Sequence, residues 1–227
     1  GDKWGHRFRA LMMSVKTEAD LLKAKSWRFS NCLARNPEWL GGAFNAWLEG
    51  NAVVTPKGDI VDILRVDITP KMKTEHAAIV RVSAKGRKAS FDPDKDFIPF
   101  PGGSKKFAIR WDPQTKKYWS LVNYIPEKHQ AGRPASTRNT LALASSPDLR
   151  AWTIQCVLLY HPDVEKHGFQ YVDWLFESGD IIAVCRTAFD DGLGGAHNMH
   201  DANFLTFHRF KNFRTLTLDD SVPGWRD

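Results

Sequence analysis

Two histidines and an aspartate, His197, His200 and Asp201, lie close together in the stretch GGAHNMHDANF, residues 194–204. Imidazole groups bind metal ions, transfer protons and hydrogen-bond hydroxyl groups. The H-x-x-H-D spacing offers two imidazoles to one cation, but a metal site also needs a third protein ligand, so we expect no metal ion here. Because the preceding glycines allow a close backbone approach, we predict that the histidines bind substrate and that Asp201 takes part in proton transfer. The alternative is a polar loop that satisfies its own backbone.

Carboxylates and a tyrosine elsewhere in the chain are further candidates for acid, base or nucleophile. Cleavage of a glycosidic bond usually requires two carboxylates on opposite sides of the bond, or a tyrosine with a supporting carboxylate. Glu49 is a lone acid among apolar residues in WLEGN, where loss of hydration would raise its pKa toward that of a general acid. The alternative for Glu49 is a buried carboxylate paired with an arginine of the next blade of the fold described below. With Asp201, the candidate catalytic residues are Glu49, Tyr171 and Asp173.

Guanidinium groups and side-chain amides are candidates for substrate binding. A planar guanidinium binds a carboxylate or sugar hydroxyl groups through two parallel hydrogen bonds. The alternative for the arginines is an ion pair with a strand-end carboxylate such as Asp62 or Asp173. The predicted binding residues are Arg65, Asn123, Arg138, Asn139, Gln170 and Arg186, together with His197 and His200.

The composition of the chain argues against several classes of protein. Its 227 residues are 42% hydrophobic and 12% aromatic, enough for an ordinary globular core. The formal net charge is +6, but basic and acidic residues are interspersed, so we expect no nucleic-acid partner. No run approaches the roughly 20 apolar residues that cross a bilayer, and the first residues lack the apolar region of a signal peptide. We therefore expect no membrane partner.

The cysteines lack CxxC spacing and predict buried free thiols at Cys32, Cys156 and Cys185.

A repeat with a period of about sixty residues organises the chain. Residues 49–65, EGNAVVTPKGDIVDILR, match residues 170–186, QYVDWLFESGDIIAVCR, at a constant offset of 121 residues. In both segments a polar residue is followed by a Gly-Asp-Ile turn, an apolar run and an arginine. Midway between them, residues 109–124 read IRWDPQTKKYWSLVNY, with Asn123 in the place of the arginines. Each copy predicts a β-hairpin.

A second set of strand-like segments recurs with the same spacing, at residues 9–15, 77–83, 140–146 and 203–209. Two hairpins in each unit are typical of four-stranded antiparallel blades, so we predict an all-β fold of the β-propeller type. We expect a partial blade in residues 1–35 and blades at about 40–98, 104–160 and 167–216. These make about three and a half blades of a single propeller domain with five or six, of which the chain is a fragment. In one alternative, the tail at 215–227 completes the first blade; in another, the chain is a β-sandwich.

The segment SSPDLRAWT, residues 145–153, resembles the Asp-box of sialidases, Ser-x-Asp-x-Gly-x-x-Trp. Ser146, Asp148 and Trp152 are in place, and Arg150 stands where the glycine belongs. In this motif the aspartate closes a turn through backbone N–H groups, and the tryptophan packs beneath the hairpin.

Residues 2–216 as a whole resemble the sialidase-superfamily propellers with BNR repeats, especially bacterial exo-α-sialidase-like glycosidases. The Phe/Tyr-Arg-Ile-Pro motif, which supplies the first arginine of a sialidase, is absent. The segments that carry the resemblance are residues 47–66, 100–123, 138–153 and 168–209.

The resemblance implies a glycoside hydrolase that acts on a carbohydrate in the funnel of the propeller, by acid/base chemistry and without a cofactor. An acidic sugar suits the scattered arginines. The resemblance also implies a secreted or periplasmic location. Two alternatives remain: a non-catalytic propeller that binds a glycan or a protein through the same funnel, and a polysaccharide lyase. A lyase would use histidine with tyrosine or arginine in place of two acids.

Overall fold

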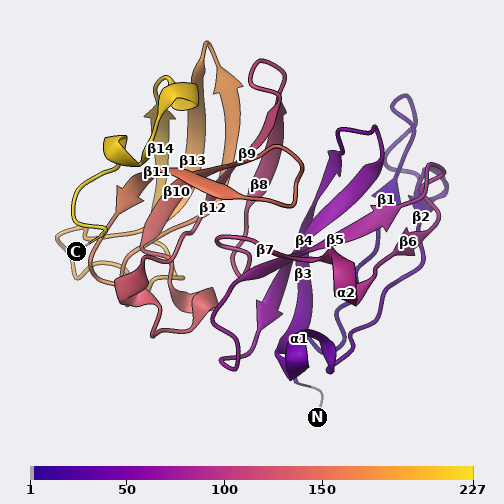
Figure 1. Ribbon diagram of the computed structural model, residues 1–227, viewed down its shortest axis with the longest axis horizontal. Helices are drawn as coiled ribbons and strands as arrows, with labels where there is room; N and C mark the ends of the chain where they lie inside the picture. The colour runs from indigo at the N-terminus through magenta and orange to yellow at the C-terminus, as the bar shows by residue number, and fades with distance from the viewer. Residues whose placement is uncertain (1–2, 227) are drawn as a thin grey trace. The chain divides into compact units, whose positions relative to one another are not determined.

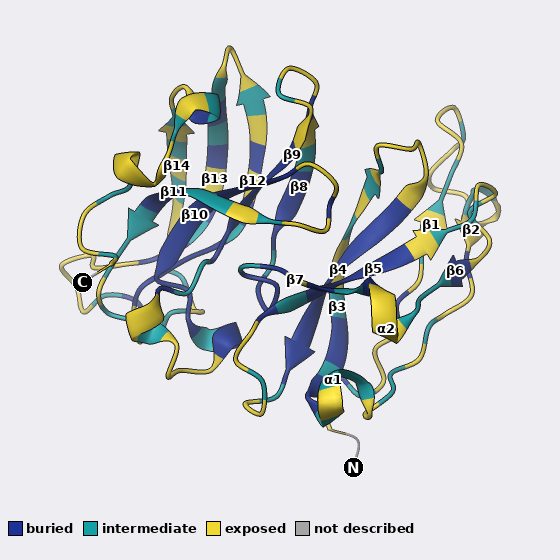
Figure 2. Ribbon diagram, in the orientation of Figure 1, coloured by how far each residue is buried: buried dark blue, intermediate teal, exposed yellow. Residues whose placement is uncertain are grey.

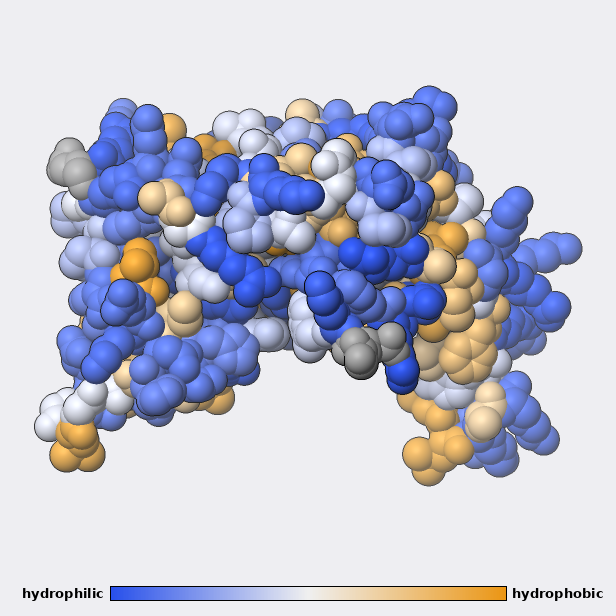
Figure 3. Space-filling model, turned by 90° about the horizontal axis from the view of Figure 1, so that it is seen from below, coloured by the Kyte–Doolittle hydropathy of each residue, from blue (hydrophilic) through white to orange (hydrophobic). Residues whose placement is uncertain are grey.

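The computed structural model describes residues 3–226. It consists of antiparallel strands with a few short helical turns, which confirms the predicted all-β class (Figure 1). The chain folds as two compact units. The first comprises Gly1–Lys71 and Ala77–Ile98, and the second comprises Met72–His76 and Pro99–Asp227. Among the described residues, no helix is long and apolar enough to span a bilayer. Hydrophilic side chains predominate on the face shown in Figure 3, with smaller hydrophobic patches among them.

The first unit is built on one antiparallel sheet with the strand order β3-β4-β5-β6, to which β7 adds by pairing with β5. The bounds are β3 (Phe44–Val54), β4 (Ile60–Ile68), β5 (His76–Val82), β6 (Ala89–Ser90) and β7 (Phe97–Pro99). Two further strands, β1 (Met13–Ser14) and β2 (Arg28–Phe29), pair only with each other. The helical turns are η1 (Ala24–Ser26), α1 (Trp39–Gly42) and α2 (Pro93–Asp96).

An aromatic cluster and a buried central strand form the core of the first unit. Ring centroids in the cluster lie 4.8–6.0 Å apart, mostly edge to face, a favourable geometry for aromatic pairs. Strand β4 is buried from Val61 to Ile68 (Figure 2). The cluster consists of Trp39, Phe44, Trp47, Phe91 and Phe97.

The amino-terminal segment is less regular than its sequence predicts. A strand was expected over residues 9–15, but only β1 and an isolated bridge between Ala10 and Leu33 form there. Leu11 and Met13 remain exposed, so this segment gains little from burial that would favour an extended ladder. The predicted blade boundaries stay predictions.

The second unit contains two antiparallel sheets with the orders β11-β10-β9-β8 and β12-β13-β14. The bounds of the first are β8 (Ala108–Asp112), β9 (Lys117–Val122), β10 (Thr140–Ser146) and β11 (Thr153–Tyr160). Those of the second are β12 (Gly168–Glu177), β13 (Asp180–Ala188) and β14 (Phe204–Phe210). Short 3-10 turns are η2 (Glu127–His129), η3 (Pro134–Ser136), η4 (Phe213–Thr215) and η5 (Leu218–Asp220).

The core of the second unit includes residues of both sheets. Strand β10 is buried along its whole length (Figure 2). The indole N–H of Trp174 in β12 donates to the carbonyl of Ala108 in β8 at 3.1 Å, which joins the sheets by a buried hydrogen bond. The free thiols of Cys156 and Cys185 are buried here as predicted, but Cys32 of the first unit is exposed, so the prediction was wrong for that residue. Its segment forms almost no regular structure that would cover it.

The turn that resembles an Asp-box has the contacts expected from its residues. Oδ1 of Asp148 accepts the backbone N–H groups of Arg150 and Ala151 at 2.8 and 2.9 Å. The ring of Trp152 packs against Phe100, with centroids 4.8 Å apart. Leu149 takes a positive φ of 67° to close the turn. The turn stabilises the β10–β11 hairpin, and its assignment to the sialidase motif stays a prediction.

The carboxyl-terminal tail lies along the second unit and adds no strand to the first. The backbone N–H of Val157 in β11 donates to Oγ of Ser221, and the N–H of Val222 donates to the carbonyl of Val157. The tail therefore occupies hydrogen-bonding groups on the edge of β11, where an exposed edge would invite pairing with another chain. The alternative in which the tail completes the first blade was wrong.

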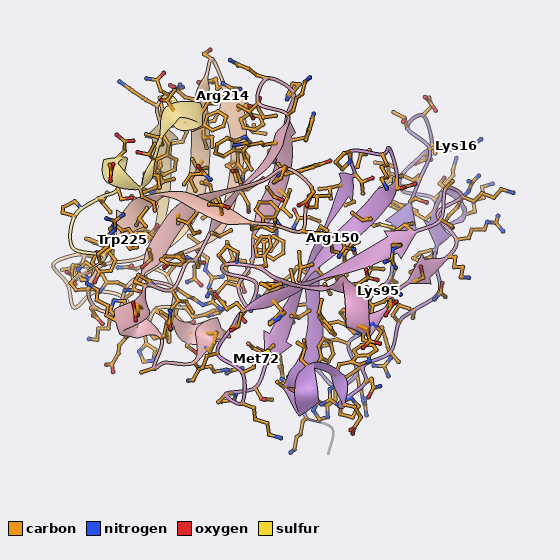
Figure 4. The ribbon with its side chains drawn as sticks, viewed as in Figure 1. Lys16, Met72, Lys95, Arg150, Arg214 and Trp225 are labelled. Carbon is orange, nitrogen blue, oxygen red and sulfur yellow. The ribbon has the colours of Figure 1, made fainter. Side chains whose placement is uncertain are left out.

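An ion pair between a partly exposed arginine and a buried aspartate connects η4 to the β8–β9 turn. Nε and NH2 of Arg214 donate to the two carboxylate oxygens of Asp112 at 2.8 and 2.9 Å. Arg214 is labelled in Figure 4. The same carboxylate accepts the backbone N–H and hydroxyl of Thr115. Arg214 foremost, with the help of Thr115, lowers the pKa of Asp112 to about 2.

Replacing Arg214 by leucine should destabilise the chain on the order of 2 kcal/mol at pH 7, because it leaves the Asp112 carboxylate buried without its cation. A carboxyl group with a lowered pKa adds stability above pH 3.8, and this stability is lost as the pH falls toward about 2. The difference between wild type and Arg214→Leu should therefore shrink over that range in thermal unfolding. Arg209→Leu removes exposed ion pairs to Glu177 and Asp180 and should cost less. Equal losses in the two variants would contradict the prediction.

Asp62 in β4 is a buried carboxyl group with an unusually high pKa. Its side chain lies against the backbone of Gly50 in β3, where a Cβ atom would stand only 2.2 Å from Oδ1 of Asp62. Loss of hydration on burial raises the pKa of Asp62 to about 6. The protonated form therefore favours the folded state, and the contribution of this group to stability falls as the pH rises from 3.8 to about 6.

Asp62→Asn should remove this pH dependence. The rise in the pKa of Asp62 from 3.8 to about 6 corresponds to a difference in the free energy of unfolding on the order of 3 kcal/mol. The variant should gain stability relative to wild type between pH 4 and pH 7, as measured by chemical denaturation at several pH values. Asp59→Asn, an exposed change in the same hairpin, should follow the wild-type profile. A difference between Asp62→Asn and wild type that stays constant from pH 4 to pH 7 would refute the assignment.

Candidate active site

The loop between β13 and β14, which contains the histidine-rich stretch, is held by its own polar side chains. Oδ1 of Asp191 accepts the backbone N–H groups of Leu193 and Gly195 at 2.7 and 2.9 Å. The amide of Asn203 donates to the carbonyl of Phe189 and to Oδ2 of Asp191. Glycines in this loop have positive φ, a conformation that other residues adopt only at a cost. These contacts give the loop a defined path across the end of the sheet.

The imidazole of His200 is oriented by a neighbouring carboxylate. Oδ1 of Asn198 accepts the backbone N–H groups of His200 and Asp201 at 2.7 and 2.9 Å, which closes a tight turn. Within this turn, Nδ1 of His200 lies 3.0 Å from Oδ1 of Asp201. The hydrogen bond from His200 lowers the pKa of Asp201, with a smaller effect from the charge of His197. A carboxylate at Nδ1 leaves Nε2 of His200 available for proton transfer.

A β-bulge in β12 places Tyr171 beside this loop. The pairing of β12 with β13 jumps from Gln170–Arg186 to Asp173–Val184. Tyr171 lies in the bulge with φ of 51°, a conformation that costs a bulky residue on the order of 1 kcal/mol or more. Its ring lies 6.1 Å from the ring of His200, edge to face. Bulges of this kind re-aim a side chain next to an active site.

Gln170 connects three segments around Tyr171 through one fully buried amide. Its Oε1 accepts NH1 of Arg138 at 2.6 Å. Its Nε2 donates to the carbonyls of Met199 and His200 at 2.7 and 2.8 Å. The amide thus fixes the loop before β10 and the loop before β14 against β12.

Two arginines flank the ring of Tyr171. The guanidinium carbon of Arg186 lies 4.7 Å from the ring centroid, and that of Arg138 lies 5.8 Å from it. NH2 of Arg186 also donates to the carbonyl of His200 and lies 3.4 Å from its Nδ1. The structure therefore brings six predicted site residues together in the second unit. We call them the Tyr171 cluster: Arg138, Gln170, Tyr171, Arg186, His200 and Asp201.

Asn123 and Asn139 lie near this cluster, and both are buried. They are 2% and 0% exposed. Nδ2 of Asn123 donates to the carbonyls of Arg138, Thr140 and Phe169, and Nδ2 of Asn139 donates to that of His161. The amide nitrogens therefore hold loop backbone, and the predicted role of these residues in binding stays a prediction.

Glu49 and Arg65 form an ion pair within the first unit. NH1 of Arg65 lies 3.1 Å from Oε2 of Glu49. The side chain of Glu49 is 41% exposed, so the prediction that it is buried and desolvated was wrong. Strand β3 also bulges next to it, between Trp47 and Gly50, which interrupts the apolar alternation that suggested burial. The pairing with an arginine agrees with the alternative for Glu49 only in part, because Glu49 is exposed and Arg65 belongs to the same hairpin, not to the next blade. Catalysis by Glu49 stays a prediction.

Asp173 and His197 lie outside the contacts of the Tyr171 cluster. Oδ1 of Asp173 pairs with NH2 of Arg110 at 3.0 Å and accepts the backbone N–H of Trp174. Because these contacts of Asp173 involve no residue of the Tyr171 cluster, we withdraw the catalytic role predicted for it. His197 is exposed on the same loop as His200, and its binding role stays a prediction.

A cavity of about 320 Å³ in the second unit was not anticipated from the sequence. Tyr124 and Trp152 are among its lining residues, as is Glu75. The carboxylate of Glu75 accepts Nζ of Lys105 at 2.5 Å and the backbone N–H groups of Gly102 and Ser104. The segment PGGSKK, residues 101–106, carries these donors, and its glycines are the signal that could have indicated a backbone cradle.

No family model matches the chain, and no curated protein matches it. Among solved structures, the fold is similar to that of an α-L-arabinanase from Penicillium chrysogenum complexed with arabinobiose, a β-propeller. The TM-score is 0.51 at 10% sequence identity, and the match covers 84% of this chain. This chain spans 53% of the length of that arabinanase. The likeness confirms the predicted β-propeller fold, while membership of the sialidase superfamily stays a prediction.

Substitutions of Gln170 should loosen the loop that carries His200. Gln170→Glu keeps the acceptor for Arg138 but removes both donors to Met199 and His200. We expect faster amide hydrogen exchange in residues 189–203, because the carbonyl of Met199 loses the Gln170 donor and that of His200 keeps only Arg186. Gln155→Glu, at a partly exposed site in β11, serves as the control and should leave this exchange unchanged. Unaltered exchange in Gln170→Glu would show that the amide does not hold the loop.

Proposed function

We propose that the Tyr171 cluster binds an acidic carbohydrate and cleaves one of its glycosidic bonds by hydrolysis. The observation that carries the proposal is that the guanidinium of Arg186 has no acidic partner in the described part of the chain. Within residues 3–226 its guanidinium pairs with no carboxylate; it donates to the carbonyl of His200 and lies against the ring of Tyr171. A guanidinium that is partly exposed and not neutralised is suited to a carboxylate on a ligand.

The neighbouring groups supply the remaining chemistry of hydrolysis. In this reaction the glycosidic C–O bond breaks, the leaving oxygen gains a proton, and water supplies the new hydroxyl group. Tyr171 is the candidate nucleophile, supported by the carboxylate of Asp201 acting through His200. Nε2 of His200 is the candidate group for moving a proton, because Asp201 occupies Nδ1. The likeness in fold to an arabinanase supports a carbohydrate-active site, though fold alone is a weak argument for function.

A second function, elimination by a polysaccharide lyase, is favoured by one specific observation. The Tyr171 cluster contains one carboxylate, Asp201, together with a tyrosine, a histidine and two arginines. A lyase needs a base to remove the proton next to the carboxylate of a uronic acid, an acid for the leaving oxygen, and a cation beside the carboxylate. His200, Tyr171 and Arg186 are of the types that could fill these roles.

The test is to incubate the protein with sialylated, uronate-containing and neutral oligosaccharides and to measure new reducing ends and new ultraviolet absorbance. Hydrolysis produces reducing ends alone, whereas elimination also produces a C=C bond conjugated with a carboxylate. Tyr171→Phe and Asp201→Asn should lower turnover by about 10²-fold or more. Calorimetry should still detect binding of the glycan to both variants. Asp173→Asn, outside the cluster, should remain near wild type.

The other outcomes also decide the question. Binding of acidic glycans without turnover by any variant would refute cleavage and leave a binding propeller. Equal turnover of Tyr171→Phe and wild type would exclude the Tyr171 cluster as the catalytic site. Absence of binding to every acidic glycan would refute the proposal as a whole.

A further inference from the structure

Three potential metal ligands from distant parts of the sequence meet in the second unit. His161 follows β11, His167 precedes β12, and Asp190 follows β13. Their ligand atoms all lie within 4.8 Å of one another. The two imidazole rings are stacked, with centroids 3.5 Å apart and an interplanar angle of 15°. Two imidazoles and a carboxylate are a donor set that suits zinc and similar divalent ions.

His167 supplies an independent sign that a ligand belongs there. Its side chain is only 5% exposed, and its Nε2 has no hydrogen-bond partner among the described residues. The nearest acidic oxygen, Oδ2 of Asp190, is 3.4 Å away, close enough for electrostatic attraction but not in hydrogen-bonding geometry. Buried polar atoms without a partner are uncommon and costly in folded proteins.

The other nitrogen of His167 is already fixed in the way that metal ligands require. Its Nδ1 lies 3.0 Å from Oδ2 of Asp163. A carboxylate at one ring nitrogen holds the proton there and directs the lone pair of the other nitrogen toward a metal. Asp163 is itself anchored by the backbone N–H groups of Glu165 and Lys166.

We propose that His161, His167 and Asp190 bind a divalent transition-metal ion, zinc in the first instance, with Asp163 orienting His167. The site is separate from the H-x-x-H-D stretch and does not depend on the proposed function. The side chain of Asp190 is 74% exposed, so the site opens to solvent. Water would complete the tetrahedral coordination that zinc prefers.

Binding requires small rearrangements that the local structure allows. Zinc–nitrogen distances are about 2.0–2.1 Å, so the stacked rings must turn to direct one nitrogen each at the same ion. The backbone N–H of Asp163 lies 3.2 Å from Nδ1 of His161. That long contact must yield if the metal binds Nε2, because a metal-bound neutral imidazole carries its proton on the other nitrogen. The exposed Asp190 can move to meet the ion.

The site would join the ends of three strands beside the Tyr171 cluster. His167 stands three residues before Gln170, and Asp190 lies at the start of the loop that leads to His200. A bound ion would therefore restrain two of the segments that also carry the cluster. Because the ligands are deprotonated and the folded state assembles them, binding should also stabilise the fold.

The experiment is a zinc titration of the full chain after treatment with a chelator, followed by calorimetry and by metal analysis after dialysis. We expect one zinc per chain, a rise in the thermal midpoint with zinc, and with Co²⁺ the intense visible absorption of a tetrahedral site. Asp190→Asn and His167→Gln should weaken binding by about 100-fold or more, and Asp163→Asn by about 10–100-fold. Asp190→Asn changes an exposed residue, which keeps the test valid if His167→Gln does not fold.

The matched controls are His197→Gln and His200→Gln, which alter the other histidine pair of the second unit. Both should bind zinc as tightly as wild type. The proposal would be overturned by absence of saturable binding to wild type, by undiminished affinity in Asp190→Asn, or by loss of binding in His200→Gln. Glycan cleavage is not part of the readout, so failure here leaves the proposed function untouched, and the reverse also holds.

Discussion

The buried amide of Gln170 fixes the positions of segments that strand pairing alone leaves independent. The ladders of β12, β13 and β14 define the sheet, but they do not determine where the loop carrying His200 crosses its end. Two hydrogen bonds from one amide to consecutive carbonyls of that loop supply the missing constraint. The same amide accepts a hydrogen bond from Arg138. The position of the Arg138 guanidinium beside Tyr171 and the path of the loop therefore both depend on Gln170.

Local signals were enough to predict the hairpins of this fold. The copies related by 121 residues form β3–β4 and β12–β13, and the intervening copy forms β8–β9. Turn residues and apolar alternation act over a few positions, so they can be recognised in one sequence. Gln170 and Arg186, matched in the repeat to Glu49 and Arg65, stand directly opposite each other. Beyond them the register differs between the copies: Asp62 pairs with Ala52, but its counterpart Ala183 pairs with Trp174. Because these hairpins can be recognised in the sequence, many residues of the candidate site can be predicted from it.

Burial and long-range pairing could not be predicted in the same way. Glu49 looks buried in its sequence, but a bulge places its side chain toward solvent. Asn123 looks like a ligand-binding residue, but three carbonyls from different segments occupy its amide. The approach of Asp190 to His167 depends on how two loops fold back on the sheet. Such contacts arise from tertiary packing, which overrides local pattern.

The close approach of Asp62 to Gly50 shows how far the two copies of the repeat have diverged. At the offset of 121 residues, Gly50 corresponds to Tyr171 and Asp62 to Ala183. One copy combines a missing side chain with a carboxyl group that occupies its space, and the other combines a large ring with a methyl group. Any side chain at position 50 would meet the carboxyl group of Asp62, so the hairpin of the first unit has room for a ring like that of Tyr171 only if Asp62 moves. The sequence repeat therefore does not extend to the residues that could bind a ligand.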